Sequence, residues 1–108
     1  MSERIHENTK TIRVTATNGV TGRLWFNDFD GNTGIIGVTA KHIEVFNADD
    51  PILGNSARVQ INLLDGNIAV DDARTIRPNE SQSRDVKAYC IAYEGIGVDV
   101  ELEITIEW

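Results

Sequence analysis

The stretch FNDFDGN, at residues 26–32, gathers oxygen-bearing side chains of the kind that bind calcium. Asp28, Asp30 and Asn32 occupy every second position, and calcium prefers carboxylate and amide oxygens as ligands. An EF-hand loop requires glycine at its sixth position and glutamate at its twelfth. If Gly31 is the sixth residue, a phenylalanine stands first and a glycine stands twelfth, so the EF-hand pattern fails. The three oxygen donors are therefore only weak candidates for a calcium site of another kind.

A second stretch, INLLDGN at residues 61–67, ends in the same DGN tripeptide. Extending both stretches upstream aligns RLWFNDFDGN with RVQINLLDGN at an offset of 35 residues. Leucine takes the place of Asp28 in the second copy, so a metal role explains at most one copy. Asp-Gly is a strong signal for a two-residue type I′ hairpin turn, whose central residues need positive φ. The repeat therefore predicts one turn geometry used twice, with Gly31 and Gly66 at positive φ.

Four carboxylates share one face of the last predicted strand: Asp99, Glu101, Glu103 and Glu107. Same-face neighbours lie about 6.6–7 Å apart, which resembles the carboxylate spacing of glycoside hydrolases. Catalytic carboxylates, however, need different environments to separate their pKa values. Because these four have similar surroundings, we interpret them as a solvated strand face that discourages edge-to-edge aggregation.

Cysteine and histidine chemistry is limited to Cys90, His6 and His42. These residues are too few for a usual zinc site, and no motif supports a pairing of Cys90 with His42. Cys90 alternates with Ala88 and Ala92 in a predicted strand, which is typical of a buried, inert thiol. No nucleophile elbow or glycine-rich phosphate loop is present. We therefore expect neither enzyme activity nor a cofactor.

Composition limits the classes of partner. The chain has 108 residues with a net charge of −7, 41 % hydrophobic and 25 % charged, which is ordinary for one globular domain. The acidic balance argues against a nucleic acid or an anionic membrane as a partner. The polar start MSERIHENTK carries no apolar signal segment, and no apolar run approaches the length of a membrane span. We therefore expect cytoplasmic synthesis without a signal peptide.

Alternation of apolar and polar residues with period two dominates the chain and predicts strands. Predicted strands cover 9–17, 39–47, 57–64, 86–93 and 98–108, the second of which fits a strand better than a short helix. Turns are expected at 18–19, 77–80 and 94–97, and polar loops at 47–56 and 74–84. With the paired Asp-Gly hairpins, this indicates about seven or eight short strands. We predict an all-β, single-domain antiparallel β-sandwich, jelly-roll-like or Ig-like, over residues 9–108, after a flexible arm at 1–8.

The predicted hairpins determine which side chains face the core. The core faces would carry Leu24, Phe26 and Ile35 in the first copy, and Val59, Ile61, Leu63, Ile68 and Val70 in the second. The opposite face of the first hairpin would carry Trp25, Phe29 and Ile36. An exposed apolar patch of this kind indicates a contact surface. We therefore expect a homo-oligomer with these three residues at its interface.

These features favour a non-enzymatic structural or binding protein. Within that class, the expectation is a self-assembling β-sandwich, such as a phage capsid-decoration protein or another virion-associated module; this is an analogy from fold type. The alternative is a small carbohydrate-binding module or lectin, assisted by calcium at the Asp- and Asn-rich loops. In that case Trp25 would stack on a sugar ring. The expected partners are thus further copies of the chain, with another protein or a carbohydrate as the alternatives.

Overall fold

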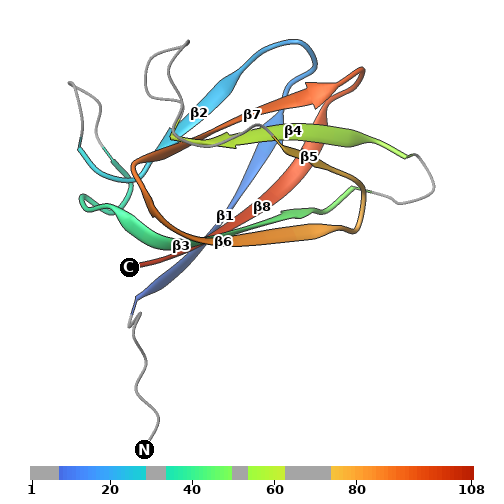
Figure 1. Ribbon diagram of the computed structural model, residues 1–108. Helices are drawn as coiled ribbons and strands as arrows, with labels where there is room; N and C mark the ends of the chain where they lie inside the picture. The colour runs from blue at the N-terminus through green and yellow to red at the C-terminus, as the bar shows by residue number, and fades with distance from the viewer. Residues whose placement is uncertain (1–7, 29–33, 50–53, 63–73) are drawn as a thin grey trace, which may run out of the picture.

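Eight β-strands account for most of the chain that the computed structural model describes, which is residues 8–28, 34–49, 54–62 and 74–108 (Figure 1). The strands are β1 (Thr9–Ala16), β2 (Gly22–Trp25), β3 (Ala40–Asn47), β4 (Ser56–Ile61), β5 (Arg74–Ile76), β6 (Ser81–Ala88), β7 (Cys90–Ile96) and β8 (Val100–Glu107). The strand count predicted from the sequence is confirmed, and residues 39–47 contain a strand as expected. Asn8, assigned to the flexible arm, instead exchanges two backbone hydrogen bonds with Trp108.

Four antiparallel pairs organise the fold: β1 with β8, β2 with β7, β3 with β6, and β4 with β5. The chain is therefore one long two-stranded ribbon whose tip is β4 and β5. Two further pairings, β3 with β8 and β4 with β7, roll the ribbon into sheets of order β1-β8-β3-β6 and β2-β7-β4-β5 (Figure 1). Of the eight described strands, only β4 and β5 are consecutive within one sheet, whereas an immunoglobulin sandwich keeps several consecutive strands together. The sandwich thus has the jelly-roll order.

The last strand supplies the centre of the core. Its inward row is at most 1 % exposed and consists of Val100, Leu102, Ile104 and Ile106. The alternation predicted for this segment is confirmed, but its place in the sheet is not that of an edge. Because the ribbon rolls up, β8 has β1 on one side and β3 on the other. Its acidic row therefore cannot protect an exposed edge, and that interpretation was wrong.

The two copies of the repeated stretch form β2 and β4, which flank β7 on opposite sides. Phe26, Val59 and Ile61 are buried, and Leu24 packs against the same cluster, so the predicted core faces are confirmed for these residues. Ile35 also packs against the core and donates a backbone hydrogen bond of 3.0 Å to Trp25. The remaining predicted positions lie outside the described residues, namely Gly31, Leu63, Gly66, Ile68 and Val70.

The Asn-Gly turn at 18–19 differs from the expected hairpin. Gly19 has a φ of 72°, and the Val20 amide donates to the Thr17 carbonyl at 3.3 Å. The turn nevertheless connects β1 to β2, which belong to opposite sheets. The end of β7 packs tightly against the end of β1, because a Cβ on Gly95 would lie 2.6 Å from the Ala16 carbonyl oxygen. Glycine is therefore required where these two crossings meet.

Two other predicted segments are divided by crossings between the sheets. Residues 86–93 contain the end of β6, a break at Tyr89 and the start of β7. The buried Asn62 holds this break: its side chain accepts the Tyr89 amide at 2.6 Å and donates to the Lys87 carbonyl at 2.8 Å. Residues 74–84, expected to form a loop, contain β5 and part of β6, separated by the predicted turn at 77–80. The boundary at 77–80 has a local turn signal, whereas the break at Tyr89 depends on the tertiary hydrogen bonds of Asn62.

A second buried asparagine, Asn47, is the last residue of β3 and also holds a connection with its side chain. The residue is fully buried, and its side-chain amide donates to the Asn55 carbonyl at 2.9 Å and the Ile76 carbonyl at 3.0 Å. Its side-chain oxygen accepts the Asp49 amide at 3.0 Å. One side chain therefore connects β3, the approach to β4 and the end of β5. All its hydrogen-bonding groups are used, as burial requires.

We predict that Asn47→Ala lowers the free energy of unfolding by about 2–4 kcal/mol, because it leaves buried carbonyl and amide groups without partners. Urea unfolding monitored by circular dichroism measures this change. Asn18→Ala is the matched control, since Asn18 is exposed and uses its backbone amide for its hydrogen bond to Asp99. The control should stay within about 0.5 kcal/mol of wild type. A similarly small effect of Asn47→Ala would contradict this role.

Candidate functional site

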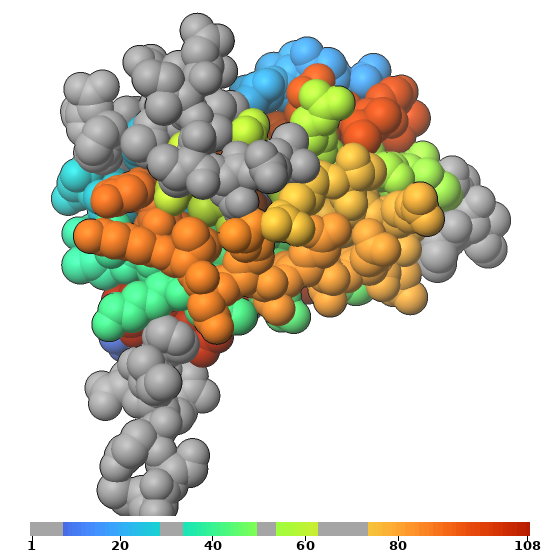
Figure 2. Space-filling model, viewed as in Figure 1, coloured from blue at the N-terminus to red at the C-terminus, as the bar shows by residue number. Residues whose placement is uncertain are grey.

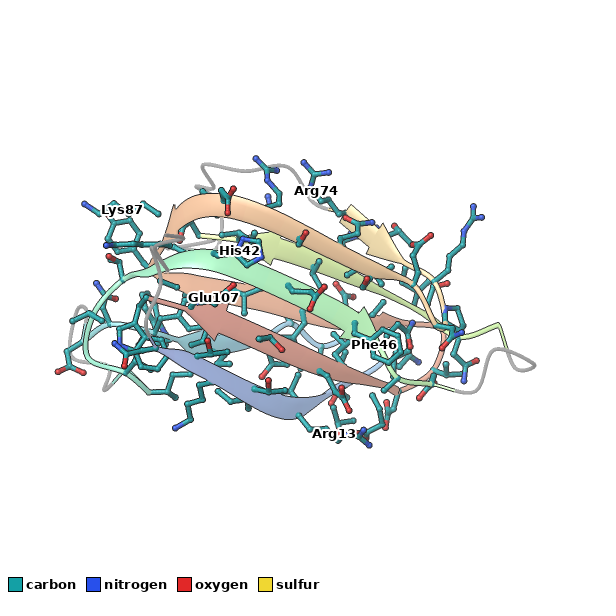
Figure 3. All side chains as sticks on the ribbon, turned by 90° about the horizontal axis from the view of Figure 1, so that it is seen from below. Arg13, His42, Phe46, Arg74, Lys87 and Glu107 are labelled. Atoms are coloured by element: carbon teal, nitrogen blue, oxygen red, sulfur yellow. The ribbon has the colours of Figure 1, made fainter. Side chains whose placement is uncertain are left out.

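The sheet β1-β8-β3-β6 turns a charged surface to solvent, which we call the carboxylate face (Figure 3). Its ionisable residues are Arg13, His42, Glu44, Asp85, Lys87, Glu101, Glu103 and Glu107. Much of this surface is paired between strands. Arg13 forms an ion pair with Glu103, and the Thr15 hydroxyl donates to Glu101 at 2.7 Å. Glu101 and Glu103 of β8 thus take part in cross-strand contacts.

His42 lies between two carboxylates on this face (Figure 3). Its Nδ1 is 2.6 Å from Asp85 Oδ1, and its Nε2 is 3.8 Å from Glu107 Oε2. Cys90 lies on β7 in the other sheet. The conceivable pairing of Cys90 with His42 is therefore wrong, because the two side chains belong to different layers.

The outward rows of β2, β7 and β4 form a second surface, which we call the tryptophan face. Its exposed or half-buried members are Arg23, Trp25, Arg58, Gln60 and Glu94, whereas Cys90 and Ala92 share these rows but are buried. Trp25 is half-buried, and the Arg23 guanidinium carbon lies 6.0 Å from its ring centroid, within cation–π range. Arg23, Ala92 and Gln60 form one row across the three strands. The small alanine therefore leaves a depression between the longer side chains of β2 and β4.

A groove of about 130 Å³ lies at this depression. Its lining combines a small apolar floor with polar side chains, namely Thr21, Arg58, Val59, Gln60, Ala92, Tyr93 and Glu94. Arg58 and Glu94 are directly opposite each other on neighbouring strands. Within the described ranges, however, neither takes part in an ion pair shorter than 4.0 Å. The described part of the chain thus leaves both charges without an ion-pair partner.

A smaller cavity lies between the sheets at the side formed by β5 and β6; Figure 2 shows β6, in orange, across the front of the molecule. Its lining is Ile43, Val45, Val59, Ile61, Arg74, Ile76, Gln82 and Arg84. The volume of about 20 Å³ is enough for about one water molecule. The cavity is therefore too small for an organic ligand.

The expected interface residues separate in the structure. Trp25 lies on the outward row of β2, as predicted from the alternation. Ile36 is half-buried and packs against the core cluster, so it does not share that row. Phe29 lies outside the described residues. Of the expected interface residues, Trp25 is thus the one that the structure places on the tryptophan face.

The calcium candidates receive no geometric support from the described part of the chain. Asp28 Oδ1 accepts the Gly34 amide at 2.7 Å, a local contact that orders the chain after β2. Asp30 and Asn32 lie outside the described residues. Over ranges 8–28, 34–49, 54–62 and 74–108, no group of three or more His, Cys, Asp or Glu side chains could hold a metal ion.

Sequence reasoning missed Arg58, Gln60 and Glu94 as surface partners of Trp25. The alternation along each stretch already indicates that Arg23 lies on the same strand face as Trp25. It likewise places Arg58 on the same strand face as Gln60. What the alternation lacks is the pairing of both strands with β7. That pairing places the two copies on one face and adds Glu94 between them.

Cys90 belongs to the outward row of β7 but is fully buried, as predicted for this thiol. Burial raises the pKa of Cys90, while the nearby Arg23 charge and a hydrogen bond with Asn62 oppose the rise. The thiol therefore keeps its proton at neutral pH. A protonated, buried thiol is a poor nucleophile.

Comparison with known proteins adds no relative: no protein-family model matches the chain, and no curated protein is similar to it. In the described part of the chain, no helix is long and apolar enough to cross a membrane. The candidate site therefore rests on its own geometry.

We predict that wild-type protein loses stability relative to Cys90→Ala as the pH rises above about 8.5, the ordinary thiol pKa. The folded thiol holds its proton more tightly than the unfolded thiol. In this range the unfolded state binds fewer protons, so a rising pH favours unfolding. Urea unfolding of both proteins at about pH 7 and about pH 10 measures the difference. Tyr93, whose pKa burial also raises, is common to both. Identical pH dependences would show that the buried thiol is not responsible.

Proposed function

We propose that this protein is a non-enzymatic structural module that self-associates through the tryptophan face. The observation that carries the proposal is the combination, on one outward surface, of Trp25 with arginine and glutamate side chains that lack ion-pair partners among the described residues. Interfaces are enriched in tryptophan and arginine, and these residues supply much of the binding energy. The carboxylate face, in contrast, has several of its polar groups paired within the chain.

The jelly roll occurs in viral capsid domains and in lectins. A fold hosts many functions, so the fold alone does not select between them. A small acidic domain with a preformed contact surface suits a component of a larger particle. Our proposal is therefore a particle-associated protein, such as a capsid-decoration module of a phage.

We predict that wild-type protein is oligomeric at high micromolar concentration and that Trp25→Ala dissociates it. Truncation of a central aromatic residue at an interface costs about 2 kcal/mol or more of binding free energy. Light scattering after size exclusion measures the native mass, and circular dichroism should remain of β type. Val38→Ala is the control, because Val38 is 46 % exposed and lies outside the tryptophan face.

Two results would count against this proposal. A monomeric wild-type protein would remove the self-association itself. A Trp25→Ala variant that unfolds would mean that the indole is needed for folding. In that case Arg58→Ser, at an exposed position of the same face, provides the second test of the surface.

Carbohydrate binding is the second candidate function, and the groove beside Arg58 and Glu94 favours it. Its volume is about 130 Å³, and planar polar side chains surround a small apolar floor. Such groups can hydrogen-bond to sugar hydroxyls, while Trp25 lies further along the same face to contact an apolar sugar surface.

We predict, for this second function, that a glycan array detects binding by wild-type protein and not by Gln60→Ala or Glu94→Ala. Binding should persist in a calcium chelator if the groove alone forms the site. Glu80→Ala serves as the control, since Glu80 is an exposed residue of the turn between β5 and β6. An array without signal at high protein concentration would exclude this function for the glycans tested.

A further inference from the structure

We infer that self-association is head to tail: the tryptophan face of one copy docks on the carboxylate face of the next. This inference rests on the proposed function and names the partner of the same surface. The two faces are the outer surfaces of opposite sheets, so they point away from each other in one molecule. One copy can therefore contact two neighbours at once.

The charges of the two faces are complementary. The carboxylate face carries five carboxylates and two permanently charged cations, Arg13 and Lys87. Among the described residues, the tryptophan face carries two arginines and one carboxylate, that of Glu94. Complementary charge steers two surfaces together and sets their relative orientation.

Two unused charges show where this complementarity could act. Glu44 is exposed at the middle of β3, and no ion pair or hydrogen bond satisfies its carboxylate among the described residues. Arg58 is exposed on β4 and likewise forms no ion pair there. A contact between successive copies would give each of these groups a partner that the described residues of its own chain do not provide.

Apolar groups are complementary as well. Phe46 is half-buried and lies on the carboxylate face between Glu103 and Ser81, next to the row of Glu44 (Figure 3). An aromatic side chain within a charged surface offers apolar contact area to Trp25 of the neighbouring copy. Aromatic residues surrounded by charged groups are the usual composition of an interface centre and its rim.

A symmetric contact between two tryptophan faces is less favourable. An isologous interface brings the same patch of both copies together. Counting the described residues, four guanidinium groups, from Arg23 and Arg58 of each copy, would then meet two Glu94 carboxylates. Like charges in contact cost binding free energy. A head-to-tail contact avoids this repulsion and closes into a ring or continues as a filament.

Charge reversal tests the inference. Glu44→Lys should raise the self-association dissociation constant at least tenfold, measured by sedimentation velocity over a concentration series. Arg58→Glu should do the same, and an equimolar mixture of the two variants should recover association, because the altered side chain of Glu44→Lys then meets that of Arg58→Glu. Glu80→Lys, which has the same charge change at a turn, should associate like wild type. Urea unfolding verifies that each variant remains folded.

The outcomes distinguish this inference from the proposed function. If Trp25→Ala dissociates the oligomer but Glu44→Lys associates like wild type, the tryptophan face is an interface and the head-to-tail inference is wrong. In a symmetric contact between tryptophan faces, Glu44→Lys would lie outside the interface, so mixing it with Arg58→Glu would not rescue association. A monomeric wild-type protein would overturn both.

Discussion

Pairing between the two halves of the chain is the constraint on which the structure depends. β1 pairs with β8, β2 with β7 and β3 with β6, so each of these ladders joins segments that are distant in sequence. Rolling the resulting ribbon buries one row of every strand and leaves the other row outside. The sandwich therefore has two outer faces, and each is assembled from both halves of the chain. Any function on these faces depends on the same long-range register.

Crossing between the sheets creates a second requirement, since the backbone groups at each crossing leave their ladders while they are still buried. In the described structure, two buried asparagines form hydrogen bonds with such backbone groups. Asn62 serves the crossing from β6 to β7, and Asn47 joins the end of β3 to the end of β5. An amide suits both places because it offers donors and an acceptor without a charge to desolvate. The polar side chains inside the sandwich thus help to maintain the register of the apolar ones.

Local pattern and long-range pairing explain which predictions succeeded. The alternation in β8 correctly predicted a strand, and the alternation in the repeated stretch correctly assigned Phe26 and Val59 to the core, because it requires only neighbouring residues. The central position of β8 and the break at Tyr89 depend on contacts with β3 and Asn62, which no local pattern contains. The same limit applies to the candidate site. Trp25 could be assigned to an outward row from its own strand, but the register with β7 was needed to place Arg58 on the same face.

The distribution of charge decides how a chain with a net charge of −7 could associate with itself. At physiological ionic strength the Debye length is about 8 Å, so the total charge of a neighbouring copy is largely screened before contact. At contact, the local charges of the two apposed faces decide the energy. The acidic residues of β8 and β3 gather on one face, whereas Arg23 and Arg58 lie on the other. This separation of charge follows from the alternation of side chains along each strand. The arginine of the repeated stretch points outward in both copies, and both copies flank β7. Among the described residues, the stretch that first resembled a cation site thus places its two arginines, Arg23 and Arg58, on one face of an acidic protein.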